Sequence, residues 1–155
     1  MSKLIIPSGS VVAIDPGDHT GVVVVVGGMV AYSATLMWDE ILDLIARDDD
    51  LIGCLTNYDN WVIESFVLYP WRAAQMGFDT VIPAQVIGAL RVAIRRVPRI
   101  SCSFQNAGTV KHFATDQKLK DLGWFDSLKT DHERDAARHA LFYLMHQKLK
   151  NERDT

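Results

Sequence analysis

The sequence predicts an α/β fold, a mixed five-stranded sheet with helices on both faces. Runs rich in β-branched residues come first, and later runs of this kind alternate with helix-like segments. Two apolar runs, Val11–Asp15 and Trp61–Glu64, each end in an acid. Because the second run follows a helix, we expect it to be parallel to the first.

The first three strands form an antiparallel meander. We expect strands over Val11–Asp15, Val22–Val26 and Met29–Thr35, and Gly27-Gly28 is typical of a two-residue hairpin turn. The fourth and fifth strands are expected to be parallel to the first. The remaining predicted elements are a helix over Trp38–Arg47, a loop at Asp48–Asp50, a strand over Trp61–Glu64, an irregular aromatic segment over Phe66–Phe78, a helix over Pro83–Val97, a strand over Ile100–Gln105, and short helices near Thr109–Ala114 and Asp116–Leu122.

A long helix is expected to close the chain. Thr130 and Glu133 have the spacing of a capping box, with Thr130 as N-cap, and apolar positions at helix spacing continue to about Lys148. The length of 155 residues predicts one domain over residues 1–155, with a core over about 11–149 and short flexible termini.

The composition is typical of a soluble globular protein, with 48% hydrophobic and 23% charged residues. The apolar start of the chain ends at Pro7, too early for a signal peptide, and no run approaches the roughly 18 apolar residues of a membrane span. We therefore expect no membrane partner.

Charge is unevenly distributed although the net charge is only −3. Acids dominate residues 39–59, and Lys and Arg dominate residues 91–120. A basic segment of this kind can bind phosphate on an acidic protein, but Arg91–Arg99 taken alone is equally consistent with a solvated helix face. The basic residues are Arg91, Arg95, Arg96, Arg99, Lys111, Lys118 and Lys120.

Acidic side chains are expected to meet at one edge of the sheet. Asp15 and Glu64 end adjacent parallel strands, and two carboxylates that close repel unless a cation lies between them. His132 and Asp135 are three residues apart and share a helix face. Carboxylates with one imidazole suit Mg²⁺ or Mn²⁺. Two such ions can activate a water and stabilise the leaving oxygen in phosphodiester hydrolysis. Alone, the segment after Asp15 is more typical of a satisfied turn; the joint order of the acids favours the metal site.

The order of these motifs resembles the RuvC family of Holliday junction resolvases. The resemblance runs over about residues 11–149 and is closest to the small phage-encoded branch, through the Arg-His-Ala-Leu continuation at 138–141. It implies an RNase H-like fold and a crossover junction endodeoxyribonuclease. It further implies a homodimer that cuts four-way DNA junctions, with two Mg²⁺ or Mn²⁺ ions per site, in the cytoplasm of a bacterium or phage-infected cell.

Individual roles follow from the resemblance by position. It implies Asp15, Glu64, His132 and Asp135 as catalytic metal ligands, and Lys111 as a lysine near the scissile phosphate. Many members have Asp where His132 stands, which leaves the choice between Mg²⁺ and Mn²⁺ open.

Aromatic and basic side chains are the expected DNA contacts. The family places an aromatic shortly after the Glu, but its usual position is Val67 here, so Phe66 or Tyr69 could serve. His139 lies one turn beyond Asp135 and either supports the site or packs against the sheet. The expected DNA-binding residues are Phe66, Tyr69, Arg72, Arg95, Lys111 and Lys118.

Three other functions share some of these sequence features. An RNase H-like nuclease for another branched DNA, or for RNA as in pre-rRNA processing, would use the same acids. An actin-like ATP-binding module needs a second phosphate loop and about twice this length. A catalytically inactive binding module would not need all four site positions.

Overall fold

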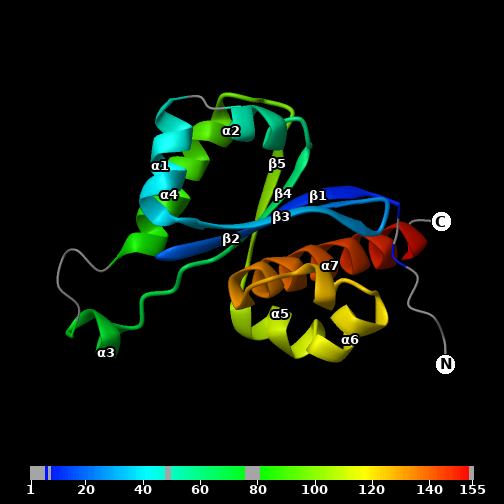
Figure 1. The fold of residues 1–155 in the computed structure, drawn as a ribbon. Coiled ribbons are helices and arrows are strands. Elements are labelled where there is room, and N and C mark those ends of the chain that lie inside the picture. Colours follow the sequence, from blue (N-terminus) through cyan, green and yellow to red (C-terminus); the bar gives the residue numbers. More distant parts are fainter. Residues whose placement is uncertain (1–5, 7, 48–49, 76–80, 154–155) are drawn as a thin grey trace.

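Five strands form one mixed sheet in the computed structural model, which describes residues 6, 8–47, 50–75 and 81–153 (Figure 1). The order across the sheet is β3-β2-β1-β4-β5. Neighbours β1, β2 and β3 are antiparallel, whereas β4 is parallel to β1 and β5 is parallel to β4. This topology confirms the predicted fold class. The strands are β1 (Ser10–Asp15), β2 (His19–Val26), β3 (Met29–Met37), β4 (Asn60–Glu64) and β5 (Ser101–Gln105).

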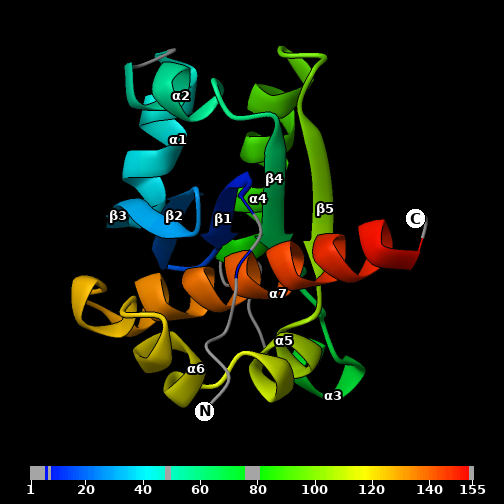
Figure 2. The same ribbon diagram turned by 90° about the vertical axis from the view of Figure 1, so that its right-hand side faces the viewer.

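Helices cover both faces of the sheet (Figure 2). One face packs against α5, α6 and α7, and the opposite face packs against α1, α2 and α4. No helix within the described ranges is long and apolar enough to cross a membrane. The helices are α1 (Trp38–Ala46), α2 (Asp50–Leu55), α3 (Pro70–Ala73), α4 (Ile82–Arg95), α5 (Ala107–Phe113), α6 (Asp116–Asp121), the short 3-10 helix η2 (Phe125–Ser127) and α7 (Asp131–Arg153).

The central strand β1 is buried on both sides, which explains its uninterrupted apolar run. Successive strand residues point to opposite faces. Val11 and Ala13 therefore join the core under α7, and Val12 and Ile14 join the core under α1 and α4. All four side chains are fully buried, so the carboxylate that follows them emerges directly from the core.

Local structure departs from the sequence prediction in two places. The acidic run expected as a loop at 48–50 contains the start of α2 at Asp50, and residues 48–49 lie outside the described ranges. The segment expected to be irregular contains α3, which Pro70 opens at a position suited to proline; its residues 76–78 are also outside the described ranges. The expected short termini fall largely on residues 1–5 and 154–155, which are not described either.

The predicted turns and caps are otherwise present. Gly27 and Gly28 have φ angles of 58° and 81°, the left-handed conformation that the hairpin turn requires. Thr130 Oγ1 accepts a hydrogen bond from the Glu133 backbone N–H, as an N-cap does. The Glu133 carboxylate accepts from Lys129 N–H instead of from Thr130, so the reciprocal half of the capping box is shifted by one residue.

Gly21 allows the start of α7 to lie directly on the sheet. It is the β2 partner of Asp15. A Cβ atom at Gly21 would lie 2.0 Å from the His132 carbonyl oxygen, which is closer than any real contact. Only glycine therefore lets the first turn of α7 approach the strand end that carries Asp15.

Candidate active site

Asp15 and Glu64 lie at the same edge of the sheet. The parallel register pairs Ile14 with Ile63, so the next residue of each strand is one of the two acids. Both side chains are largely buried, with 13% of Asp15 and 23% of Glu64 exposed. The sequence prediction placed these acids side by side, and the structure does the same.

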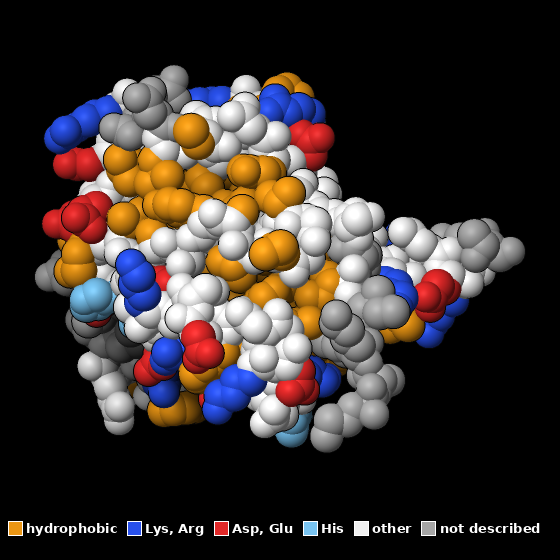
Figure 3. Space-filling view, turned by 45° about the vertical axis from the view of Figure 1, so that its right-hand side comes forward, with side chains coloured by type: hydrophobic (Ala, Val, Ile, Leu, Met, Phe, Trp, Pro, Cys, Tyr) orange, Lys and Arg blue, Asp and Glu red, His pale blue; other side chains and the backbone are white. Residues whose placement is uncertain are grey.

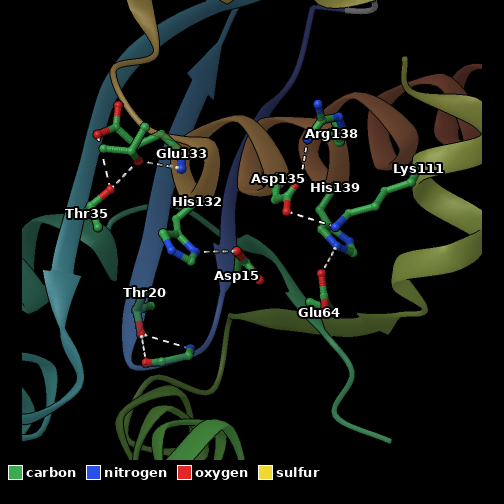
Figure 4. A network of polar contacts seen from close by, with 12 residues as sticks. Asp15, Thr20, Thr35, Glu64, Lys111, His132, Glu133, Asp135, Arg138 and His139 are labelled. Carbon is green, nitrogen blue, oxygen red and sulfur yellow. Dashed lines mark hydrogen bonds and ion pairs between the residues drawn. The ribbon is translucent and has the colours of Figure 1, made fainter. Parts of the chain in front are cut away.

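Helix α7 lies across this edge and brings His132 onto Asp15 (Figure 4). His132 Nδ1 is 3.3 Å from Asp15 Oδ2. The His132 ring also stacks on His19, with ring centroids 5.7 Å apart. Position 132 is therefore held between the end of β1 and the start of β2.

Asp135 is paired with two cationic side chains. Lys111 of α5 places Nζ 2.9 Å from Asp135 Oδ2. Arg138 donates to Asp135 Oδ1 and also to Asp116 at the start of α6. These contacts connect the α5–α6 segment to the acid on α7.

His139 contacts Glu64, whereas the sequence left open whether this residue supports the site or packs against the sheet. His139 is 1% exposed. Its Nε2 is 2.9 Å from Glu64 Oε2, and its Nδ1 is 2.9 Å from Gln105 Oε1 at the end of β5. His132, Asp135 and His139 thus occupy one stripe of α7, at spacings of three and four residues.

The clustered acids perturb the proton affinity of Asp15. The pKa of Asp15 is raised from 3.8 to about 6, chiefly by burial and then by the negative charges of Glu64 and Asp135, while His132 lowers it. The hydrogen bond with Asp135 raises the pKa of Lys111, so this ammonium stays protonated at neutral pH.

The donor set suits a hard divalent cation, but it is not assembled as a metal cage. Among the described residues, no three Asp, Glu, His or Cys side chains form a group that could hold a metal as they are arranged. Each acid instead contacts a basic partner. Burial, together with the charges of Glu64 and Asp135, nevertheless raises the pKa of Asp15, and a bound divalent cation would favour the ionised form of this carboxyl group.

The aromatic segment after β4 borders the site. Phe66, Tyr69 and Arg72 line a cavity of about 340 Å³ together with Glu64. Trp71, which the sequence prediction did not single out, is 63% exposed and stacks on Tyr69 with ring centroids 6.0 Å apart. Exposed neighbouring aromatics were detectable in the sequence, but their stacking depends on the turn of α3.

The basic segment does not form one surface directed at the site. Arg95 lines a separate hollow with Cys102 and Phe104. Arg99 pairs with Asp59, which precedes β4 and lies at the opposite end of that strand from Glu64. Lys118 donates to the Phe113 carbonyl and lies over its ring. Of the basic residues expected to bind DNA, Lys111 and Arg72 are those that border the acids or their cavity.

Comparison with solved structures identifies the architecture. The structure of T. thermophilus RuvC in complex with a Holliday junction substrate superimposes with a TM-score of 0.70, at 16% sequence identity, over 91% of this chain and 96% of that one. The fold is that of RuvC. A second structure of Thermus thermophilus RuvC matches with a TM-score of 0.68, at 17% identity and the same coverage. No family model and no curated protein sequence matches the chain.

The match to RuvC confirms the resemblance that the motifs indicated and the RNase H-like fold it implied. At this identity the likeness concerns the fold. Activity, metal ions and DNA binding are therefore argued below from the chain's own residues.

Proposed function

We propose that this protein is a divalent-metal-dependent, structure-selective endonuclease that resolves four-way DNA junctions by phosphodiester hydrolysis. The observation that carries the proposal is the meeting of acids from β1, β4 and α7 at one sheet edge, beside a lysine ammonium. The similar fold of a RuvC protein solved with a Holliday junction substrate supports the choice of DNA.

Asp15, Glu64, His132 and Asp135 are the proposed ligands of Mg²⁺ or Mn²⁺, with two ions per site. Carboxylate oxygens suit both ions, and the His132 imidazole favours Mn²⁺ over Mg²⁺. Such ions activate a water and stabilise the leaving oxygen when they are bound. The chain itself supplies Asp15 as the central acid, with negative neighbours on both sides.

Lys111 is the proposed contact to the scissile phosphate. Its ammonium is half-exposed and stays charged, because the neighbouring acids raise its pKa. A fixed cation beside the reacting phosphate stabilises the charge that develops in the transition state. The same ammonium balances Asp135, which keeps it at the site in the free protein.

Phe66, Tyr69 and Arg72 are the proposed contacts to DNA next to the cut. They surround the cavity that begins at Glu64, and exposed rings can stack on unpaired bases. Arg95 and Lys118 would contribute only long-range electrostatic attraction to the DNA phosphate backbone, since neither residue borders these acids. Binding should weaken as salt rises, with a slope set by the phosphates that Lys and Arg neutralise.

A homodimer is proposed because two symmetric cuts need two sites. The sheet edge at β5 and the adjoining α4 expose Phe104 and Val92, 39% and 52% accessible. On a different side of the molecule, Figure 3 shows hydrophobic side chains gathered on one face, with Lys and Arg mixed among Asp and Glu around them. An oligomer measurement by light scattering tests this part of the proposal.

The deciding experiment compares substrates and variants in one cleavage assay. A four-way junction, a fork, a linear duplex and an RNA–DNA hybrid are each incubated with Mg²⁺ or Mn²⁺. We expect paired nicks in the junction only. Asp15→Asn should abolish cleavage and keep junction binding, whereas Asp126→Asn, the same change at an exposed acid of η2, should cut normally.

Each other result has a defined meaning. Cleavage of the hybrid or fork in preference to the junction would support nuclease activity but would contradict the four-way junction as the substrate. Full cutting by Asp15→Asn, or no cleavage of any substrate by the unmodified protein with either ion, would refute the proposed site.

A further inference from the structure

His139 is a buried polar residue whose two ring nitrogens both have partners. The imidazole is 1% exposed, and Nε2 donates to Glu64 Oε2 while Nδ1 faces the side-chain amide of Gln105, each at 2.9 Å. Burying an imidazole is unfavourable unless its nitrogens are hydrogen-bonded. This ring therefore depends on its two partners, and the partners are fixed by it.

Gln105 is itself anchored beside Glu64. The Gln105 carbonyl accepts hydrogen bonds from both the backbone N–H and the hydroxyl of Ser65, the residue that follows Glu64. Its side-chain amide offers Nδ1 both a donor and an acceptor. The end of β5 thus holds both the chain after Glu64 and the ring that contacts Glu64.

The same helix makes two histidine–carboxylate pairs at the site. His132 contacts Asp15 of β1, and His139, seven residues later, contacts Glu64 of β4 (Figure 4). Seven residues correspond to nearly two helical turns, so both rings leave α7 on the same side. The two contacts differ in burial, since 46% of the His132 side chain is exposed.

We propose that His139 is a positioning residue that fixes the Glu64 carboxylate for cation binding, through a hydrogen bond to Oε2 that is held in place by Gln105. In the part of the chain that the structure describes, this bond engages Oε2 and does not occupy Oε1 of the same carboxylate, which is the oxygen that the proposal assigns to the cation. This inference rests on the proposed function, because it assigns a role at the same metal site.

Residues that orient metal ligands in this way change metal affinity when they are replaced. Losing such a partner typically costs about 10–100-fold in metal affinity or activity. Without His139, the Glu64 side chain would regain rotamer freedom next to two other acids, and ordering it on binding would oppose metal uptake.

The test measures Mn²⁺ binding directly, by electron paramagnetic resonance titration of the DNA-free protein, and then junction cleavage. His139→Leu keeps most of the volume and removes the hydrogen bonds. His139→Gln restores an amide donor, Gln105→Ala removes the partner of Nδ1, and His146→Leu is the matched control at an exposed histidine of α7. Thermal unfolding establishes that each variant is folded.

We expect His139→Leu to bind Mn²⁺ about 10–100-fold more weakly, with a lower kcat and an unchanged KM for the junction. His139→Gln should recover part of the affinity, Gln105→Ala should show a smaller loss, and His146→Leu should match the unmodified protein. If His139→Leu does not fold, Gln105→Ala and His139→Gln decide the question.

Two results would separate this role from the proposed function. Unmodified protein that binds Mn²⁺ and cleaves, with His139→Leu and Gln105→Ala both binding Mn²⁺ as His146→Leu does, would refute the positioning role alone. His139→Gln that is as impaired as His139→Leu would also refute it. Unmodified protein that neither binds Mn²⁺ nor cleaves would refute the nuclease itself.

Discussion

Asp15→Asn should make the metal-free protein more stable, although it removes the central acid of the site. Asn keeps the size of the side chain and an oxygen that can accept the hydrogen bond from His132. It removes a buried negative charge that faces Glu64 and Asp135. Asp15 is thus expected to destabilise the folded protein although it is a proposed ligand of the metal ion.

The size of the gain follows from the proton affinity of Asp15. Its pKa is raised from 3.8 to about 6 in the folded protein, so the ionised carboxylate destabilises the fold by about 3 kcal/mol, at about 1.4 kcal/mol for each tenfold change in proton affinity. This cost is fully present above pH 6 and disappears below pH 3.8, where the group is protonated in both states. In a domain of this size, about 3 kcal/mol corresponds to a rise in Tm of about 6–12 °C.

The assay is chemical denaturation of both proteins in a chelator, at several pH values from 4 to 8. The stability difference should be largest near pH 8 and should vanish toward pH 4, and Asp126→Asn should show no comparable gain. Adding Mn²⁺ should stabilise the unmodified protein and leave Asp15→Asn unchanged. A variant that is less stable than the unmodified protein at pH 8, or a gain that does not depend on pH, would refute the reasoning.

Three further predictions concern the same edge of the sheet. Gly21→Ala should destabilise the fold by about 1–3 kcal/mol and abolish cleavage, because its Cβ would meet the His132 carbonyl; unchanged unfolding in urea would contradict this. Lys111→Met should lower kcat about 10²–10³-fold with junction binding nearly kept, measured in single-turnover cleavage; a pure loss of binding would assign the lysine to the DNA backbone instead. Mn²⁺ affinity should fall about tenfold for each pH unit below the pKa of Asp15, about 6, because this carboxyl must lose its proton to bind; calorimetric titrations that give one affinity from pH 5 to 7 would argue against Asp15 as a ligand.

Most of the fold could be predicted because its signals are local. The apolar runs rich in β-branched residues, the paired glycines of the hairpin and the threonine cap each specify an element from a few neighbouring residues. The parallel pairing of β1 and β4 followed from one further argument, that a helix connects them. The starts of α2 and α3 were missed because a short helix has too few residues for a recognisable period, and its stability comes from tertiary packing.

Only part of the candidate site could be predicted from the sequence. Asp15, Glu64, His132 and Asp135 could be named, and the structure brings them to one edge, while their roles stay predictions. The pairing of His139 with Glu64 could not be predicted. An i+4 spacing shows that two residues lie on the same side of a helix, but it does not show which strand lies beneath them. Nor could the sequence show that the basic segment splits, since Arg99 meets its partner Asp59 only in the folded protein.

The ion pairs of Asp135 affect the order in which DNA and a metal ion would bind to the proposed site. Lys111 and Arg138 place two positive charges among the acids before any metal arrives. An edge carrying three uncompensated carboxylates would repel the phosphates of a nucleic acid, whereas this partly neutralised edge lets them approach. For the proposed nuclease, DNA would then be able to bind before the metal ion does, and binding of the cation, rather than binding of the substrate, would start cleavage.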